Sequence, residues 1–259
     1  MFSDIQAQFI GCDQLQILES INKKRLLQDN TQTRNLELAY LKQACNIRKK
    51  NSDVIGFKAG LTSKNSQNKF NSNTPIFGVL TKGNKSQSNK IIIKEGIYLL
   101  ETELAFRIKK EIKDLKQINA EISQLVDAVA PAIEVPKIKG SSLNSVTLNS
   151  LVEANAGAHK FILGEFVPLD KANINQTEIQ ILSEGKVLRN GISSRPLNDQ
   201  ESAMYWLMKK ALREGYTIPK GAVLLTGTIT KPLVLRDSQY KINFSQLGEI
   251  IIDVSEVVD

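Results

Sequence analysis

Residues 98–108 alternate apolar and polar side chains over most of their length, and this period of two constrains the fold more than any other stretch. Successive side chains of a strand point to opposite faces, so Glu101 and Glu103 share one face. The other face suits a hydrophobic core: Tyr98, Leu100, Thr102, Leu104, Phe106 and Ile108. The segment predicts a long strand with one buried face, as is typical of antiparallel sheets. Its two carboxylates either form half of a site for a hard cation or simply face water.

Two charged residues lie in apolar surroundings where a charge is unexpected. Glu134 belongs to the run 126–136, which has few other charges, and a carboxylate buried there must be paired, hydrogen-bonded or protonated. An internal salt bridge or an exposed edge position explains it equally well. Lys58 has Gly56 and Gly60 on its own face of an expected strand, and such small neighbours permit close approach by backbone or ligand. It could hold a substrate carboxylate or carry a proton, or it could extend its ammonium to water.

Several kinds of catalytic site lack their residues. With His159 as the sole histidine and only two cysteines, a Ser-His-Asp triad, a His-rich zinc site or a thiolate metal cluster is not expected. The segment 78–85 approaches a phosphate-binding loop, but Asn84 stands where that loop needs lysine. No glycine fingerprint of a dinucleotide site is present. Nucleotide chemistry is therefore not predicted.

The chain has 259 residues and a net charge of +7, from 34 basic and 27 acidic residues. The lysines are scattered rather than massed beside aromatic residues, so we expect no nucleic-acid partner. A positive field favours a small anionic substrate. No run approaches 18 apolar residues, so we expect no membrane partner. Two cysteines without a disulfide framework, Cys12 and Cys45, favour a reducing, cytoplasmic setting.

Periodicity predicts an α+β chain rather than a regular βαβ series. We expect helices at 13–28, 33–50, 121–130, 148–158 and 199–214, and a short helix capped by Thr62 or Ser63. We expect strands at 54–61, 91–93, 131–136, 161–164, 179–182, 186–189, 223–228, 240–244 and 249–254. Strand 91–93 should pair with the strand of Glu101 in an antiparallel hairpin. Thr226, Gly227 and Thr228 end a strand with hydroxyls and a free amide, which suit a carboxylate or carbonyl, although an ordinary glycine turn is equally compatible.

Taken in order, several of these stretches resemble the fumarylacetoacetate hydrolase superfamily, specifically its 2-keto-4-pentenoate hydratase branch, which includes 4-oxalocrotonate decarboxylase. The matching stretches are Gly56–Ser63, Pro75–Gly78, Glu101–Glu103, Pro131–Val135, Asn155-Ala156 with Leu163-Gly164, Leu225–Thr228 and Leu247–Ile250. They cover about residues 35–255 with order and spacing kept. The resemblance implies a mixed β-sandwich roll as the catalytic domain, residues 54–259. We expect residues 1–53 to form a helical portion packed on it.

The resemblance also implies a function. The metal ligands of the family fall on Glu101, Glu103 and Glu134, its ion is Mg²⁺ or Mn²⁺, and its glycine-flanked lysine falls on Lys58. The expected activity is that of a hydro-lyase acting on a small 2-oxo or 2-hydroxydienoic acid through a metal-stabilised enolate, with Thr226, Gly227 and Thr228 binding substrate. We also expect a homo-oligomer.

One departure from the family pattern leaves alternatives open. Hydratases of this branch often carry an acidic residue in the turn where this chain has Ile76. Decarboxylation, C–C hydrolysis, or a non-catalytic binding role on the same fold therefore remain as alternatives.

Overall fold

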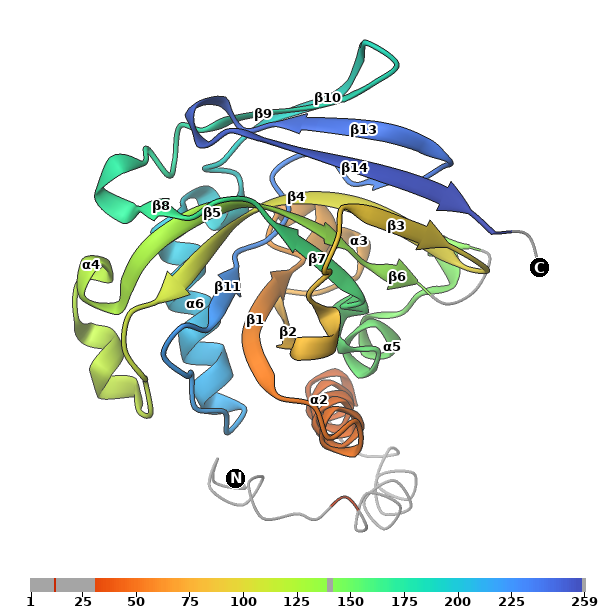
Figure 1. Cartoon of the computed structure of the whole chain (residues 1–259). Helices are drawn as coiled ribbons and strands as arrows, with labels where there is room; N and C mark the ends of the chain where they lie inside the picture. The colour runs from red at the N-terminus through yellow and green to blue at the C-terminus, as the bar shows by residue number, and fades with distance from the viewer. Residues whose placement is uncertain (1–11, 13–30, 139–141, 258–259) are drawn as a thin grey trace.

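The computed structural model of the chain describes residue 12 and residues 31–138 and 142–257 (Figure 1). Its larger sheet has the strand order β2-β1-β11-β4-β5-β7, and three short strands extend it. The six main strands are β1 (Val54–Gly60), β2 (Ile76–Thr81), β4 (Ile97–Ile108), β5 (Val126–Val135), β7 (Lys160–Leu163) and β11 (Val223–Leu225). The short strands are β6 (Lys137–Ile138) and β12 (Leu233–Val234), which pair with β4, and β8 (Val167–Pro168), which pairs with β5.

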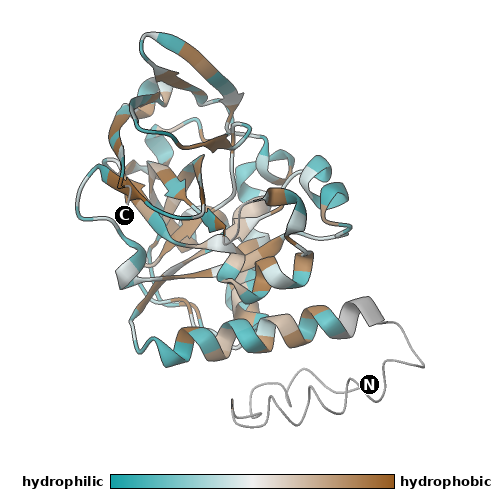
Figure 2. Ribbon diagram, turned by 90° about the vertical axis from the view of Figure 1, so that its right-hand side faces the viewer, coloured by the Kyte–Doolittle hydropathy of each residue, from teal (hydrophilic) through white to brown (hydrophobic). Residues whose placement is uncertain are grey.

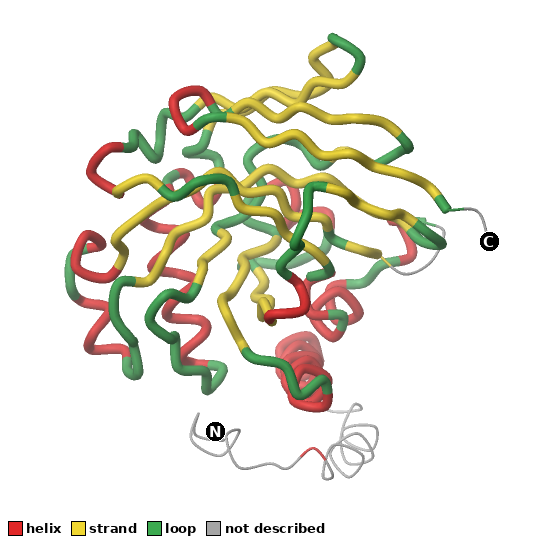
Figure 3. The backbone as a smooth tube through the Cα atoms, viewed as in Figure 1, coloured by secondary structure: helices red, strands yellow, loops and turns green. Residues whose placement is uncertain are grey.

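A second sheet lies against the first (Figures 1 and 3). Its order is β10 (Lys186–Ile192), β9 (Glu178–Ser183), β13 (Ser238–Asn243), β14 (Glu249–Glu256) and β3 (Lys90–Ile93). Most neighbours in the two sheets are antiparallel, but β1 pairs parallel with β11 and β14 with β3. Mixed sheets with few helices confirm the predicted α+β class.

The predicted hairpin of residues 91–93 with the Glu101 strand is wrong. β3 pairs with β14, and β4 pairs with β5 in the other sheet. Gly96, at φ +115°, has a backbone conformation that other residues rarely adopt. It lies in the short connection that carries the chain from the small sheet into the large one.

The described helices are α2 (Thr31–Lys49), α3 (Lys64–Lys69), α4 (Ile122–Leu125), α5 (Leu148–Glu153) and α6 (Gln200–Arg213). α6 confirms the helix predicted at 199–214, and Asp199 caps it by accepting a hydrogen bond from the Ser202 amide. The buried face of α6 carries Ala203, Met204, Leu207, Met208 and Ala211. This face packs against β1 and β2 of the large sheet (Figure 1). Ser63 caps α3 as predicted, with a reciprocal bond from Ser66.

The predicted helix over 121–130 is largely wrong, because only α4 is helical and β5 begins at Val126. These residues form a strand instead of a helix because 126–130 pair with β4, where Val129 lies opposite Phe106. Pro131 consequently lies inside β5, where its missing N–H would weaken a central strand. Its backbone faces the gap between β7 and β8, and its carbonyl there accepts a hydrogen bond from the Gly164 amide at 2.9 Å.

The hydrophobic core lies between the sheets and under α6, and interior strands are coloured as hydrophobic in Figure 2. α2, predicted at 33–50, joins this core through Ala39, Tyr40 and Ile47. Gln43 on the same helix donates to the carbonyls of Phe77 and Val152, at 2.9 and 3.0 Å. This helix therefore packs on the main body, while the division at residue 53 stays a prediction. The helix predicted at 13–28 lies outside the described residues.

The two cysteines form a disulfide, Cys12–Cys45, with Cα atoms 5.6 Å apart. They are therefore not the pair of thiols that the sequence analysis assumed, and they give no support to a reducing compartment. Among the described helices, none has the length and apolar character needed to cross a membrane.

Candidate metal centre and substrate pocket

Three carboxylates converge on one face of the large sheet. Glu101 lies directly opposite Glu134 in the antiparallel register of β4 and β5, and Glu103 lies opposite Ala132. Because opposed residues share a face and alternate residues on one strand do too, the pleat places all three side chains together. One oxygen from each carboxylate lies within 4.8 Å of the others. The structure thus brings together the three glutamates that the sequence analysis selected.

The buried carboxylates receive few hydrogen bonds from the rest of the described protein. Glu103 and Glu134 have no exposed surface, whereas Glu101 is partly exposed to a cavity. The Gly227 amide donates to Glu103 Oε2 at 2.8 Å. Glu103 Oε1 and Glu134 Oε1, however, have no hydrogen-bond partner among the described residues. Buried acceptors of this kind are costly unless a cation satisfies them.

The donor set suits a hard divalent cation. Oxygen-only ligands favour Mg²⁺, Mn²⁺ or Ca²⁺ over softer metals. Three carboxylates on two adjacent strands leave further coordination positions to water or substrate. The residues present therefore fit the metal that the resemblance implies.

Lys58 on β1 is the fourth charged member of this cluster. Its ammonium lies 2.6 Å from Glu134 Oε2 and donates to the Ala156 carbonyl at 3.1 Å, and its side chain is 2% exposed. The internal salt bridge considered for Glu134 from sequence is therefore present. The extension of Lys58 into water is not.

The two glycines beside Lys58 have different surroundings: Gly60 lines the cavity, whereas Gly56 faces the backbone of β11. A Cβ on Gly56 would lie 2.1 Å from the Val223 carbonyl oxygen, so this glycine allows β11 to approach β1. The glycine that makes room for Lys58 is Gly78 on β2, its register partner. A Cβ there would lie 2.8 Å from Lys58 Cγ. Sequence reasoning missed this role, because it depends on which strand pairs with β1.

The charges in the cluster shift one another's pKa. Burial alone lowers the pKa of the Lys58 ammonium, but the carboxylates, led by Glu134, outweigh it and the pKa rises above its usual value. Burial raises the pKa of the Glu101 carboxyl to about 7, although Lys58 acts in the opposite direction. Burial, reinforced by Glu134, also raises the pKa of Glu103 well above its usual range. In the metal-free protein Lys58 is therefore charged, and the carboxylates retain protons at unusually high pH.

A strained turn holds the carbonyl that Lys58 contacts. Asn155, Ala156 and Gly157 all have positive φ, at 59°, 52° and 73°. The Asn155 side chain anchors this turn to β2: it accepts from the Val79 amide and donates to the Val79 carbonyl, both at 2.8 Å. Such conformations persist only when their surroundings enforce them. The predicted helix over 148–158 is therefore wrong beyond Glu153, where α5 ends, because residues 155–157 adopt the left-handed conformation instead.

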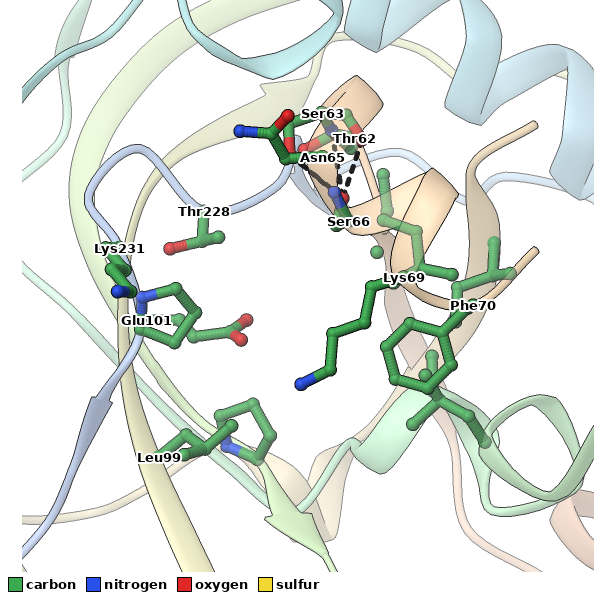
Figure 4. A pocket seen from close by; sticks show the side chains of 18 of the residues that line it. Thr62, Ser63, Asn65, Ser66, Lys69, Phe70, Leu99, Glu101, Thr228 and Lys231 are labelled. Carbon is green, nitrogen blue, oxygen red and sulfur yellow. Dashed lines mark hydrogen bonds between the residues drawn. The ribbon is translucent and has the colours of Figure 1, made fainter. Parts of the chain in front are cut away.

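A cavity of about 520 Å³ opens beside the cluster (Figure 4). Its polar and charged lining includes Lys58, Thr62, Ser63, Asn65, Ser66, Lys69, Glu101, Arg195, Thr228, Thr230 and Lys231, and its apolar lining includes Ile76, Leu99 and Phe70. Thr228, one of the predicted substrate-binding residues, lies on its wall (Figure 4). The cations Lys69, Arg195 and Lys231 were not selected from sequence, where exposed lysine and arginine carry no distinctive pattern.

The other two predicted substrate-binding residues point elsewhere. Thr226 is fully buried and donates to Gln200 Oε1 on α6 at 2.5 Å. Gly227 directs its amide at Glu103 and has φ +112°, and a Cβ there would lie 2.5 Å from Thr62 Oγ1. Gly227 thus supports the carboxylate cluster, Thr226 links its strand end to α6, and Thr228 faces the cavity.

Comparison with known proteins agrees with this architecture. No family model matches the chain. The 2-hydroxyhexa-2,4-dienoate hydratase of Comamonas testosteroni is 26% identical over 241 residues, which cover 88% of this chain and 89% of that protein. The 2-keto-4-pentenoate hydratase of Paraburkholderia xenovorans is 23% identical over 210 residues, covering 78% and 77%. A solved structure of 4-oxalocrotonate decarboxylase from Pseudomonas putida G7, complexed with magnesium and adipate, superposes with a TM-score of 0.79 at 19% identity, covering 95% and 99%. In sequence the chain is thus similar to hydratases of small unsaturated acids, and in fold it is similar to 4-oxalocrotonate decarboxylase and to a solved protein of the fumarylacetoacetate hydrolase family.

The carboxylate cluster and the cavity beside it form one site, since Glu101 and Lys58 belong to both. Ile76, at the position where the hydratases often carry an acid, is 1% exposed and lines the cavity. It packs close to Gly60, whose added Cβ would lie 3.0 Å from Ile76 Cγ1. The site therefore has an apolar wall at the point where the sequence departs from the hydratase pattern.

Proposed function

We propose that this chain is a divalent-metal-dependent hydro-lyase, of the 2-keto-4-pentenoate hydratase type, that acts on a small 2-oxo or 2-hydroxydienoic acid. The observation that carries the proposal is the convergence of Glu101, Glu103 and Glu134 beside a cavity. Two of their buried oxygens, Glu103 Oε1 and Glu134 Oε1, receive no hydrogen bond from the residues that the structure describes. The names of the sequence relatives, which are hydratases, support the same reaction class.

The three glutamates would hold Mg²⁺ or Mn²⁺. Such an ion supplies Lewis-acid polarisation of a 2-oxo acid bound through its carboxylate and keto oxygens. The chain's own contribution is to place Thr228 as a hydroxyl donor on the cavity wall and to exclude water along the apolar wall. The Gly227 amide keeps Glu103 oriented toward the cluster.

Lys58 supplies a fixed positive charge beside the cluster. Because its pKa lies above the usual value, the ammonium keeps its charge and can donate hydrogen bonds, but it is not available as a base at neutral pH. It also offsets the repulsion between Glu134 and its neighbours. We assign it the role of a charged group that stabilises negative charge developing on the substrate.

Decarboxylation is the second candidate, and Ile76 is the observation that favours it. Addition of water to a distal carbon requires a group that moves protons near that carbon, and the wall formed by Ile76 offers none. In an unsaturated 2-oxo dicarboxylate, loss of CO₂ breaks the C–C bond to the distal carboxylate, and the electron pair passes through the conjugated double bond to the 2-oxo group. A proton then replaces the carboxylate, and no water molecule has to be activated.

Turnover assays separate these candidates. Loss of the ultraviolet absorbance of 2-hydroxypenta-2,4-dienoate in the presence of Mg²⁺ or Mn²⁺ is the result expected for a hydratase. CO₂ release from an unsaturated 2-oxo dicarboxylate, without loss of the dienoate, identifies a decarboxylase. Melting of the protein with metal, with and without oxalate, reports the site independently of turnover. If neither metal nor oxalate raises the melting temperature, the proposed function is wrong; if both do but nothing turns over, a binding role remains.

A further inference from the structure

The turn at residues 226–228 lies between two points at which the chain is held by β4. Pairing of β11 with β4 ends at Leu225. The chain returns to β4 at Ile229, whose amide donates to the Thr102 carbonyl at 2.7 Å. The contacts of residues 226–228 therefore decide where the Gly227 amide points.

Gln200 makes one of these contacts. It is the first residue of α6, and its side chain is fully buried. Its Oε1 accepts a hydrogen bond from Thr226 Oγ1 at 2.5 Å, and its Nε2 donates to the Ser193 carbonyl. The backbone amide of Gln200 donates to Asn175 Oδ1 at 2.8 Å. The side-chain amide has one favourable orientation, because turning it round would place its oxygen against the Ser193 carbonyl oxygen.

The loop that precedes α6, residues 193–199, holds the far end of the same turn. Arg195 Nη1 donates to the Ile229 carbonyl at 3.2 Å. The Leu197 amide donates to the Thr62 carbonyl at 3.1 Å, and Leu197 has a φ of +50°, a conformation that persists only where the surroundings enforce it. Together with the start of α6, this loop therefore contacts the turn at both of its ends.

We propose that Gln200 is a positioning residue of the metal site, which acts through Thr226 to direct the Gly227 amide at Glu103. That amide donates to Glu103 Oε2 at 2.8 Å, and Glu103 Oε1 has no partner among the described residues. The bond thus fixes the carboxylate with one oxygen left for a cation. Hydrogen-bond partners of this kind orient metal ligands and raise metal affinity. The effect on metal affinity rests on the proposed function, whereas the effect on the Gly227 amide does not.

Hydrogen exchange in the metal-free protein tests the positioning directly. Labelling with ¹⁵N-glycine confines the NMR spectrum to the amides of the 15 glycines. The Gly164 amide, which donates to the Pro131 carbonyl at 2.9 Å, serves as the internal reference. Gln200→Met keeps the length of the side chain without its donor and acceptor. We expect it to raise the ratio of the Gly227 exchange rate to the Gly164 exchange rate by about tenfold, because the turn opens locally.

Calorimetric titration with Mg²⁺ measures the consequence for the metal, without any turnover. We expect the Kd for Mg²⁺ to rise about tenfold in Gln200→Met. Thr226→Val removes the hydroxyl at the other end of the same hydrogen bond and should have the same effect. The double variant Gln200→Met/Thr226→Val should bind no more weakly than either single variant, because both substitutions remove one interaction. Thr226→Ser keeps the hydroxyl and should bind Mg²⁺ as the parent does.

Gln43 on α2 provides the matched control. It is also buried, and its Nε2 donates to the carbonyls of Phe77 and Val152. Gln43→Met therefore removes a buried amide side chain of the same kind, and it should lower the melting temperature to a similar extent as Gln200→Met. The ratio of the Gly227 and Gly164 exchange rates should stay at the parent value. Melting temperatures also establish that each variant is folded.

The outcomes separate this proposal from the proposed function. If Gln200→Met speeds the exchange of Gly227 and Gly164 equally, or of neither, Gln200 contributes only to stability and its positioning role is overturned. The role is also overturned if the exchange ratio rises in Gln43→Met as well, or if the parent and Gln200→Met bind Mg²⁺ equally well. If the exchange ratio rises in Gln200→Met alone but the parent binds no Mg²⁺, Gln200 does position the Gly227 amide and the proposed function is the part that fails.

Discussion

The ammonium of Lys58 lies 2.6 Å from Glu134 Oε2, and both side chains are almost completely buried. Each residue is a charge in an otherwise apolar strand, and the ion pair explains how both charges can be buried. The pair also joins β1 to β5, which are separated in the sheet by β11 and β4. A buried pair of this kind is costly to break because the remaining charge has no partner.

Removing the lysine should expose this cost. Lys58→Met keeps much of the side-chain volume and leaves three neighbouring carboxylates without a cation. We expect the free energy of unfolding of the metal-free protein, from urea titration at pH 8, to fall by about 3–5 kcal/mol. The double variant Lys58→Met/Glu134→Gln should recover part of the loss. If Lys58→Met unfolds at the same urea concentration as the parent, the pair does not stabilise the fold.

Removing one ligand should abolish metal binding without unfolding the protein. In Glu103→Gln the Gly227 amide keeps an oxygen acceptor, and one of three mutually repelling carboxylates is lost. We therefore expect metal-free Glu103→Gln to melt at or above the parent temperature. Mg²⁺ should raise the melting temperature of the parent by several degrees and leave that of Glu103→Gln unchanged.

The exposed Glu95→Gln provides the matched control and should respond to Mg²⁺ as the parent does. An undiminished response of Glu103→Gln would remove this residue from the metal site. Melting followed by circular dichroism is sufficient for all three proteins.

The rise in melting temperature that Mg²⁺ produces should become larger as pH rises. Burial raises the pKa of Glu101 from 4.5 to about 7, so between these values the folded protein binds more protons than the unfolded chain. The stability of the metal-free protein should therefore fall as pH rises through this window. A metal must displace the same protons, so the Mg²⁺-induced rise in melting temperature should be small at pH 5.5 and larger at pH 8.

Glu101→Gln removes a group that titrates in this window. Its metal-free stability should depend less on pH between 5 and 7.5 than that of the parent. Equal pH dependence in the two proteins would show that Glu101 does not titrate there.

The strand of Glu101 was predictable because its alternation is long and regular, and residues 98–108 bury the expected face. Predicting the carboxylate triad required the resemblance to a known family, because the local sequence does not show that β5 lies beside β4. The contact of Lys58 with Glu134 could not be predicted from the sequence. It depends on the curvature of the large sheet, in which the strands are not arranged in the order in which they occur along the chain. The β3 pairing failed for a related reason: proximity in sequence favours a hairpin, whereas burial of Ile91 and Ile93 is satisfied in the other sheet.

Gly78 gives the sharpest test of how closely the fold holds Lys58. In Gly78→Ala the new Cβ would lie 2.8 Å from Lys58 Cγ and 3.0 Å from the Asn155 carbonyl, so the lysine or the strained turn must move. We expect a loss of about 1–3 kcal/mol in unfolding free energy by urea titration and a weaker response to Mg²⁺. Gly83→Ala is the control, because the nearest atom to its Cβ is Thr81 Oγ1 at 3.9 Å, and it should change stability by less than about 0.5 kcal/mol. Equal effects of the two substitutions would mean that the space at Gly78 is not needed to position Lys58.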